Sequence, residues 1–131
     1  VQLANSGAAD LYQVACALLQ SSKLDKPALA DLCAKWGRGA SSARDIRAGA
    51  VFCIDRLLRY AALRASKIKT DDLCGFEISV IERLANSHSA EQLARFHGEF
   101  VANAAKAMTL YLDFSRFLER YLTKICEKTL P

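Results

Sequence analysis

Apolar side chains recur every three or four residues along most of the chain, and this spacing places them on one face of a helix. The first stripe consists of Leu11, Val14, Leu18 and Leu19, and the later ones follow it after short polar breaks. Residues 67–75 are polar and are expected to form a loop. The stripes predict a series of helices: 9–21, 25–37, 42–66, 78–85, a fifth that begins near Ser89, and a last one after residue 113.

Capping residues mark several of the predicted helix starts. Asp25 precedes the second stripe, and its carboxylate can accept a hydrogen bond from a backbone N–H group of the first turn. Ser89 and Gln92 have the spacing of a capping box, and Ser42 with Asp45 resembles one. We therefore expect helices to begin at these three places.

The C-terminal part of the chain contains more apolar surface than one helix face needs. A single helix over residues 90–128 would be about 58 Å long, so we predict a break at 111–113, with Asp113 capping the last helix. The apolar side chains of that helix cover more than an arc of about 100°; they are Phe114, Phe117, Leu118, Tyr121, Leu122 and Ile125. They either pack deeply within the chain's own bundle or partly contact another subunit. In the second case the candidate interface consists of Tyr111, Phe114, Phe117 and Tyr121.

The composition agrees with helices. Hydrophobic residues make up 52% of the 131 residues, and six glycines and two prolines are few for the turns of a β-sandwich. We expect an all-α fold, a single compact bundle of five to six helices that forms one domain over residues 1–131. No stretch approaches the roughly 18 uncharged apolar residues of a membrane-spanning helix. The chain starts at Val1 rather than at a methionine, so we expect it to be part of a longer protein.

Positive charge is concentrated in the middle of the chain. Residues 38–69 contain eight basic residues and two acidic ones, within a chain of net charge +4. The candidate basic surface consists of Arg56, Arg59, Arg64 and Lys67. This surface either contacts phosphates or an acidic partner, or it is a solvated helix face with local pairs such as Asp55 with Arg59.

The residues that usually perform chemistry do not form a familiar site. None of the five cysteines (Cys16, Cys33, Cys53, Cys74 and Cys126) has the close spacing of a zinc site, and the first three lie among apolar neighbours, which favours core packing in a reducing compartment. His88 is expected in a turn and His97 on a helix surface. Asp71 and Asp72 have no further ligands nearby. We assign no catalytic, cofactor-binding or metal-ligating residue, and we expect no enzyme in this segment alone.

Four segments in order resemble a known family. They are 6–36, 52–66, 77–100 and 107–122, and they are similar to the C-terminal helical domain of the delta-prime subunit of the bacterial DNA polymerase III clamp loader, with the alphaproteobacterial branch most similar. The most specific piece is Leu110-Tyr111-Leu112-Asp113, where the family often has Leu-Asn-Leu-Asp before its terminal helix. Tyr111 departs from that pattern.

The resemblance implies a collar domain that joins subunits into a ring and does not itself catalyse. The partners would be the gamma/tau and delta subunits, and the parent protein would belong to a cytoplasmic DNA-directed DNA polymerase holoenzyme. An ATPase-like module would precede the collar, DNA contact would be indirect or weak, and no cofactor, small-molecule substrate or membrane is implied. Two alternatives remain open: a helical nucleic-acid-binding module that uses residues 38–69, and an enzyme domain whose active site lies partly outside this chain.

Overall fold

The computed structural model describes residues 8–20, 25–37, 43–70, 73–109 and 114–127. Within these ranges it contains helices and no strand, so the predicted all-α fold is confirmed. The helices are α1 (Ala8–Gln20), α2 (Lys26–Gly37), α3 (Ala43–Ala65), α4 (Gly75–Ser87), α5 (Ala90–Thr109) and α6 (Phe114–Glu127).

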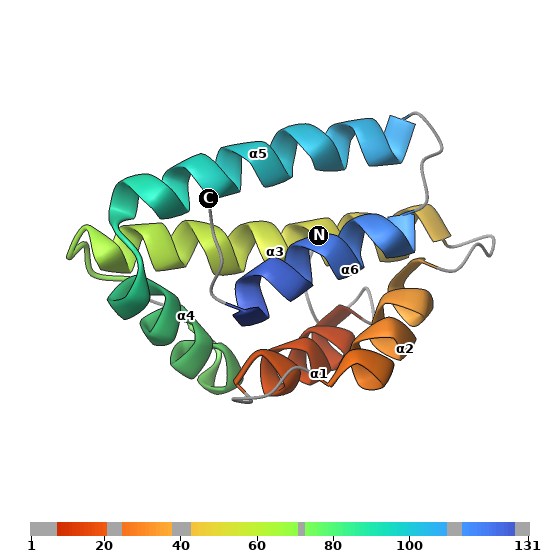
Figure 1. Cartoon of the computed structure of the whole chain (residues 1–131), viewed down its shortest axis with the longest axis horizontal. Coiled ribbons are helices and arrows are strands. Elements are labelled where there is room, and N and C mark those ends of the chain that lie inside the picture. Colours follow the sequence, from red (N-terminus) through yellow and green to blue (C-terminus); the bar gives the residue numbers. More distant parts are fainter. Residues whose placement is uncertain (1–7, 21–24, 38–42, 71–72, 110–113, 128–131) are drawn as a thin grey trace.

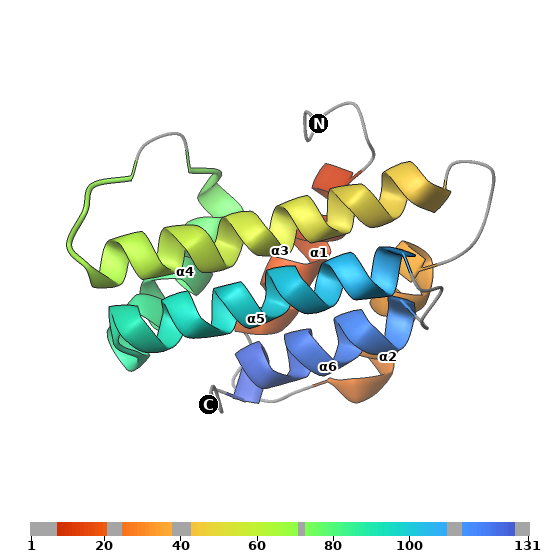
Figure 2. The same ribbon diagram turned by 90° about the horizontal axis from the view of Figure 1, so that it is seen from above.

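The two longest helices, α3 and α5, lie side by side and run in opposite directions (Figures 1 and 2). The α1–α2 pair lies on the other side of the molecule, and α4 connects the two parts along one edge (Figure 1). Helix α6 fills the space between them, because it contacts α2 and α1 on one side and α5 on the other. The last helix of the chain therefore packs against three others.

All six helices contribute apolar side chains to one core. Among the largest fully buried side chains are Trp36, Tyr12, Tyr121, Phe96 and Phe100. Burying a large apolar side chain contributes roughly 1.5–3 kcal/mol relative to leaving it exposed, so aromatic residues from α1, α2, α5 and α6 supply much of the stabilisation.

Two of the predicted helix starts are confirmed by their hydrogen bonds. The backbone N–H of Ala28 donates to Oδ1 of Asp25 over 3.1 Å. The N–H of Gln92 donates to Oγ of Ser89 (3.1 Å), and the N–H of Ser89 donates to Oε1 of Gln92 (3.0 Å), which is the reciprocal pattern of a capping box. Ser42 and Asp113, the other predicted caps, lie outside the described residues.

Helix α4 is longer than the prediction of 78–85. It begins at Gly75 after Cys74, whose side chain makes no capping hydrogen bond. A carboxylate in the first turn, that of Glu77, is favoured by the helix dipole. The start was missed because cysteine gives no recognisable capping signal. Helix α5 ends at Thr109 and α6 begins at Phe114, and the break predicted at 111–113 lies outside the described residues.

Candidate functional site

Two arginines of the predicted basic surface are turned toward acidic residues of α4. Nε of Arg56 donates to both carboxylate oxygens of Glu77, over 2.9 and 3.2 Å. The side chain of Glu77 is fully buried and that of Arg56 is only 13% exposed. Burial alone would lower the pKa of Arg56, but the hydrogen bond to Glu77 and its charge raise it. The pair is thus a buried ion pair between α3 and α4.

A second pair lies about two turns further along α3. Nη1 of Arg64 donates to Oε1 of Glu82 over 3.0 Å, and Nε of Arg64 donates to Oγ1 of Thr70 over 3.1 Å. The prediction of one exposed basic surface is therefore wrong for Arg56 and only partly right for Arg64, which is 32% exposed. The charges of both arginines are balanced by carboxylates from a different helix.

Arg59 and Lys67 are the exposed members of the predicted basic surface. Arg59 lies 3.9 Å from the carboxylate of Asp55, so the predicted local pair is confirmed. The guanidinium groups of Arg56 and Arg59 both lie over the ring of Tyr60, at 4.9 and 5.6 Å from its centroid. This face of α3 is largely occupied by contacts within the chain.

His97 is not the helix-surface residue that the sequence indicated. Its Nε2 lies 2.5 Å from Oδ1 of Asp55, and both side chains are about one-quarter exposed. The contact joins α5 to α3. The neighbouring histidine, His88, directly follows α4 as expected, and its Nδ1 lies 3.2 Å from the carbonyl oxygen of Leu84.

The predicted subunit interface is mostly part of the chain's own core. Phe114 and Tyr121 are buried, Phe117 is half-buried, and Tyr111 lies outside the described residues. The ring of Phe100 packs edge-on against Tyr121 and is stacked on Phe117, with centroid separations of 5.3 and 5.4 Å. Phe114 and Tyr121 are therefore not available to a second subunit in this conformation. The wide apolar arc of α6 follows from its three neighbours within the chain.

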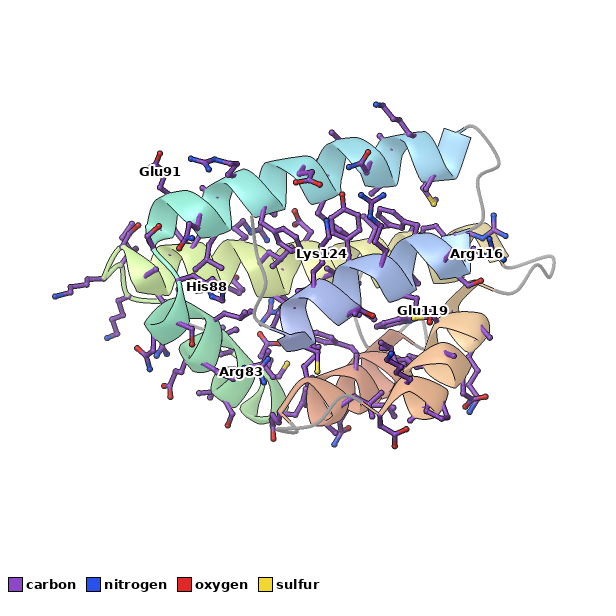
Figure 3. The ribbon with its side chains drawn as sticks, viewed as in Figure 1. Arg83, His88, Glu91, Arg116, Glu119 and Lys124 are labelled. Atoms are coloured by element: carbon purple, nitrogen blue, oxygen red, sulfur yellow. The ribbon has the colours of Figure 1, made fainter. Side chains whose placement is uncertain are left out.

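The guanidinium group of Arg83, on α4, contacts the C-terminal ends of α1 and α6. Arg83 donates to the backbone carbonyls of Leu19 in α1 and Ile125 in α6, the latter over 3.5 Å, and Figure 3 shows it directed into the angle between these helices. Burial lowers the pKa of Arg83 below its ordinary value. Carbonyl groups near helix C-termini carry partial negative charge, so Arg83 is positioned to hold α1 and α6 against α4.

A basic hollow lies between α5 and α6. Its volume is about 230 Å³, and its lining includes Asn103, Lys106, Arg116, Arg120, Phe117 and Tyr121. The same arginines and Lys124 border a shallower hollow along the outer face of α6. This surface was not predicted from the sequence, because its basic residues do not form a contiguous segment. The sequence feature that could have predicted it is the spacing of the basic residues 116, 120 and 124, which are about one helical turn apart and so lie on one face of a helix.

Two residues that line the basic hollow, Asn103 and Tyr121, are joined by a hydrogen bond. Nδ2 of Asn103 donates to the Tyr121 hydroxyl over 2.6 Å, and that hydroxyl donates to Oε1 of Glu99 over 3.3 Å. Burial raises the pKa of Tyr121 above its ordinary value. The contact fixes α6 against α5 and so fixes the shape of the hollow.

A third hollow, between α3 and α5, is apolar. Its volume is about 330 Å³, and six side chains line it: Ala48, Val51, Val101, Ala104, Ala105 and Met108. Val101 is 43% exposed, which makes it one of the large apolar side chains that the described surface presents to solvent. Five of the six positions are small or β-branched and hold no polar group, so another helix could approach this strip closely.

The buried thiols belong to the core, as predicted. Cys16, Cys33 and Cys53 are buried, and burial raises the pKa of each to about 12. At neutral pH they are protonated and are therefore poor nucleophiles.

Among the described residues no group of three or more potential metal ligands occurs, and no described helix is long and apolar enough to cross a membrane.

Comparison with known proteins found no match: no family model, no curated protein and no solved structure is similar to this chain.

Proposed function

We propose that this chain is a helical subunit-assembly domain, the collar domain of a clamp-loader delta-prime subunit that supports loading of the sliding clamp in DNA replication. The resemblance of residues 6–36, 52–66, 77–100 and 107–122 to that family motivates the proposal. The structural observation that carries it is the apolar strip between α3 and α5.

The strip suits a helix of a neighbouring subunit better than a polar ligand. All six of its side chains are apolar, and it lies along the two longest helices, which pack against each other. Burying exposed apolar surface favours association by roughly 25 cal/mol for each Å² removed from water. The proposed interface therefore consists of α3 and α5, in place of the α6 aromatic residues that the sequence suggested. Its occupant is a helix of the gamma/tau or delta subunit.

Reconstitution tests the proposal. The chain is mixed with purified gamma/tau and delta subunits at micromolar concentration, and complexes are detected by native mass spectrometry. The expected result is a stable complex that Val101→Glu weakens at least tenfold, because the substitution would bury a charge without a partner.

Val14→Glu is the matched control. Val14 is 49% exposed on α1, comparable with Val101 on α5, and it lies outside the apolar strip. The control is expected to assemble as the unmodified chain does, and both variants should keep their helical circular dichroism spectra. Absence of a complex, or equal weakening by both substitutions, would contradict the proposal.

A further inference from the structure

The basic hollow between α5 and α6 gathers cations from both helices. Lys106 projects from α5, and Arg116, Arg120 and Lys124 follow one another along α6. Within the part of the chain that the structure describes, Lys106 and Arg120 have no ion-pair partner. The two helices therefore place unpaired cations on both sides of one hollow.

Two carboxylates lie near these cations: Glu99 pairs with Lys124, and Glu119 borders the outer hollow of α6. Oε1 of Glu99 lies 4.0 Å from Nζ of Lys124 and also accepts the hydrogen bond from Tyr121. Glu119 lies on the side of α6 that faces α2, where its charge raises the pKa of Cys33, whereas Lys124 reaches toward α5 (Figure 3). Lys106 and Arg120 are therefore left without a carboxylate partner among the described residues.

We propose that this hollow binds the phosphodiester backbone of a single-stranded nucleic acid. Arginines four residues apart on a helix are separated by about 6 Å along its axis, a spacing comparable with that of successive phosphates in one strand. Arginine is also suited to bidentate hydrogen bonding with phosphate oxygens. The side chains of α6 thus form a row, and Lys106 contacts the strand from the opposite side.

The floor of the hollow favours an extended strand over a duplex. Phe117 is half-buried there and Asn103 is partly exposed, so an aromatic ring and an amide lie between Lys106 and the arginines of α6. A basic groove with aromatic side chains is the arrangement that binds single strands, because every base has a face that can contact a ring. A duplex would present its outer phosphates to the arginines but leave the floor empty.

A basic hollow elsewhere on the described surface lacks these features. It lies at the end of α3 and is lined by Arg64, Lys67, Ile68, Lys69 and Thr70. Arg64 is already bound to Glu82, no aromatic side chain lines the hollow, and two aspartates follow Thr70 directly in the sequence. The α5–α6 hollow is therefore the better phosphate-binding surface, and the inference holds whether or not the chain assembles with other subunits.

Fluorescence anisotropy with a labelled oligothymidylate of about 20 nucleotides tests the inference on the full chain. The decisive variant is Lys106→Gln with Arg120→Gln. Its matched control is Lys67→Gln with Arg59→Gln, which removes one exposed lysine and one exposed arginine from the surface that the sequence first suggested. Unfolding curves establish that both variants are folded.

The expected result is tenfold or greater weakening in the first variant and less than twofold in the control. The slope of log affinity against log salt concentration should fall by about 1.4, since each lost phosphate contact on a single strand contributes about 0.7. A duplex of the same length and a polyglutamate peptide are the comparison ligands.

Four outcomes would overturn the inference. These are no binding at low salt, equal weakening in both variants, duplex binding as tight as single-strand binding, and displacement of the oligonucleotide by polyglutamate at equal charge concentration. The last outcome would instead assign the hollow to an acidic peptide.

Discussion

The contact between α3 and α4 and the hollow between α5 and α6 both gather arginines, yet they differ in what faces those arginines. Across α3 and α4, Arg56 and Arg64 each meet a carboxylate within 3.0 Å. In the α5–α6 hollow, Lys106 and Arg120 meet none among the described residues. The first arrangement joins two helices, and the second leaves an attractive surface for an anion. Basic residues in a sequence thus acquire their role from the helix that packs opposite them.

The two regions also differ in how much a charged residue contributes to the free energy of unfolding, because that contribution depends on burial. A buried ion pair depends on both partners, since removal of one leaves an unpaired charge that water cannot reach. An exposed cation is screened by solvent and salt, so its loss changes stability by only a few tenths of a kcal/mol. Substitutions in the two regions are therefore expected to differ about tenfold in their effects on the free energy of unfolding.

The largest expected effect follows from Glu77→Ala. The substitution leaves the 13%-exposed guanidinium of Arg56 without its partner and should lower the free energy of unfolding by about 3 kcal/mol. Urea unfolding followed by circular dichroism measures this. Glu91→Ala is the matched control, because Glu91 forms an exposed pair with Arg95 and should change stability by less than about 0.5 kcal/mol. Similar effects of the two substitutions would remove the distinction between buried and exposed pairs.

High pH provides the next test of the α3–α4 region, because thiols are buried beside Glu77. Burial, with the charge of Glu77 adding to it, raises the pKa of Cys16 and Cys53 from 9.0 to about 12. The folded chain thus retains protons that the unfolded chain releases. The stabilisation is fully present below pH 9 and is lost as the pH rises toward 12.

By pH 10.5 the loss should reach about 1–2 kcal/mol for each thiol. Urea unfolding at pH 7 and pH 10.5 measures it. The variant Cys16→Ala with Cys53→Ala should lose correspondingly less between the two pH values, although it starts from a lower stability because of the cavities that it creates. An identical pH dependence in the variant would show that the two thiols are not the groups that titrate.

The elements of the fold could be predicted from the sequence where the signals are local. Asp25 and the Ser89–Gln92 pair act on N–H groups within three residues of themselves, so their effect is visible in the sequence. The six helices could be predicted for the same reason, because the spacing of apolar residues depends only on the helical repeat. Cys74 lacks a capping side chain, and the start of α4 was accordingly placed too late.

The contacts between helices could not be predicted in this way. Arg56 and Glu77 are 21 residues apart, and His97 and Asp55 are 42 apart. A helix shows how wide its apolar arc is but not how many neighbours fill that arc, so Tyr121 was proposed for an interface although it lies in the core. The hollow between α5 and α6 was missed for a related reason, since Lys106 joins the α6 arginines only after folding.

The smallest expected effect is the change in the free energy of unfolding when the unpaired cations of the α5–α6 hollow are removed. Whether that change is a gain or a loss shows whether these cations oppose or support the fold. Removing two cations from a surface of net positive charge relieves repulsion, so Lys106→Gln with Arg120→Gln should raise the free energy of unfolding by about 0.5 kcal/mol at low salt. The gain should vanish in 1 M salt, where charges more than about 3 Å apart are screened.

The control, Arg59→Gln on α3 with Lys67→Gln in the turn after it, should show no gain, because Arg59 gives up its pair with Asp55. Urea unfolding at two salt concentrations measures both variants. A loss of stability in the α5–α6 variant would mean that its cations support the fold, as Arg56 and Arg64 do. A gain, accompanied by weaker strand binding, would mean that these cations oppose the fold slightly and favour a ligand, because the same two charges would then act with opposite signs on stability and on binding.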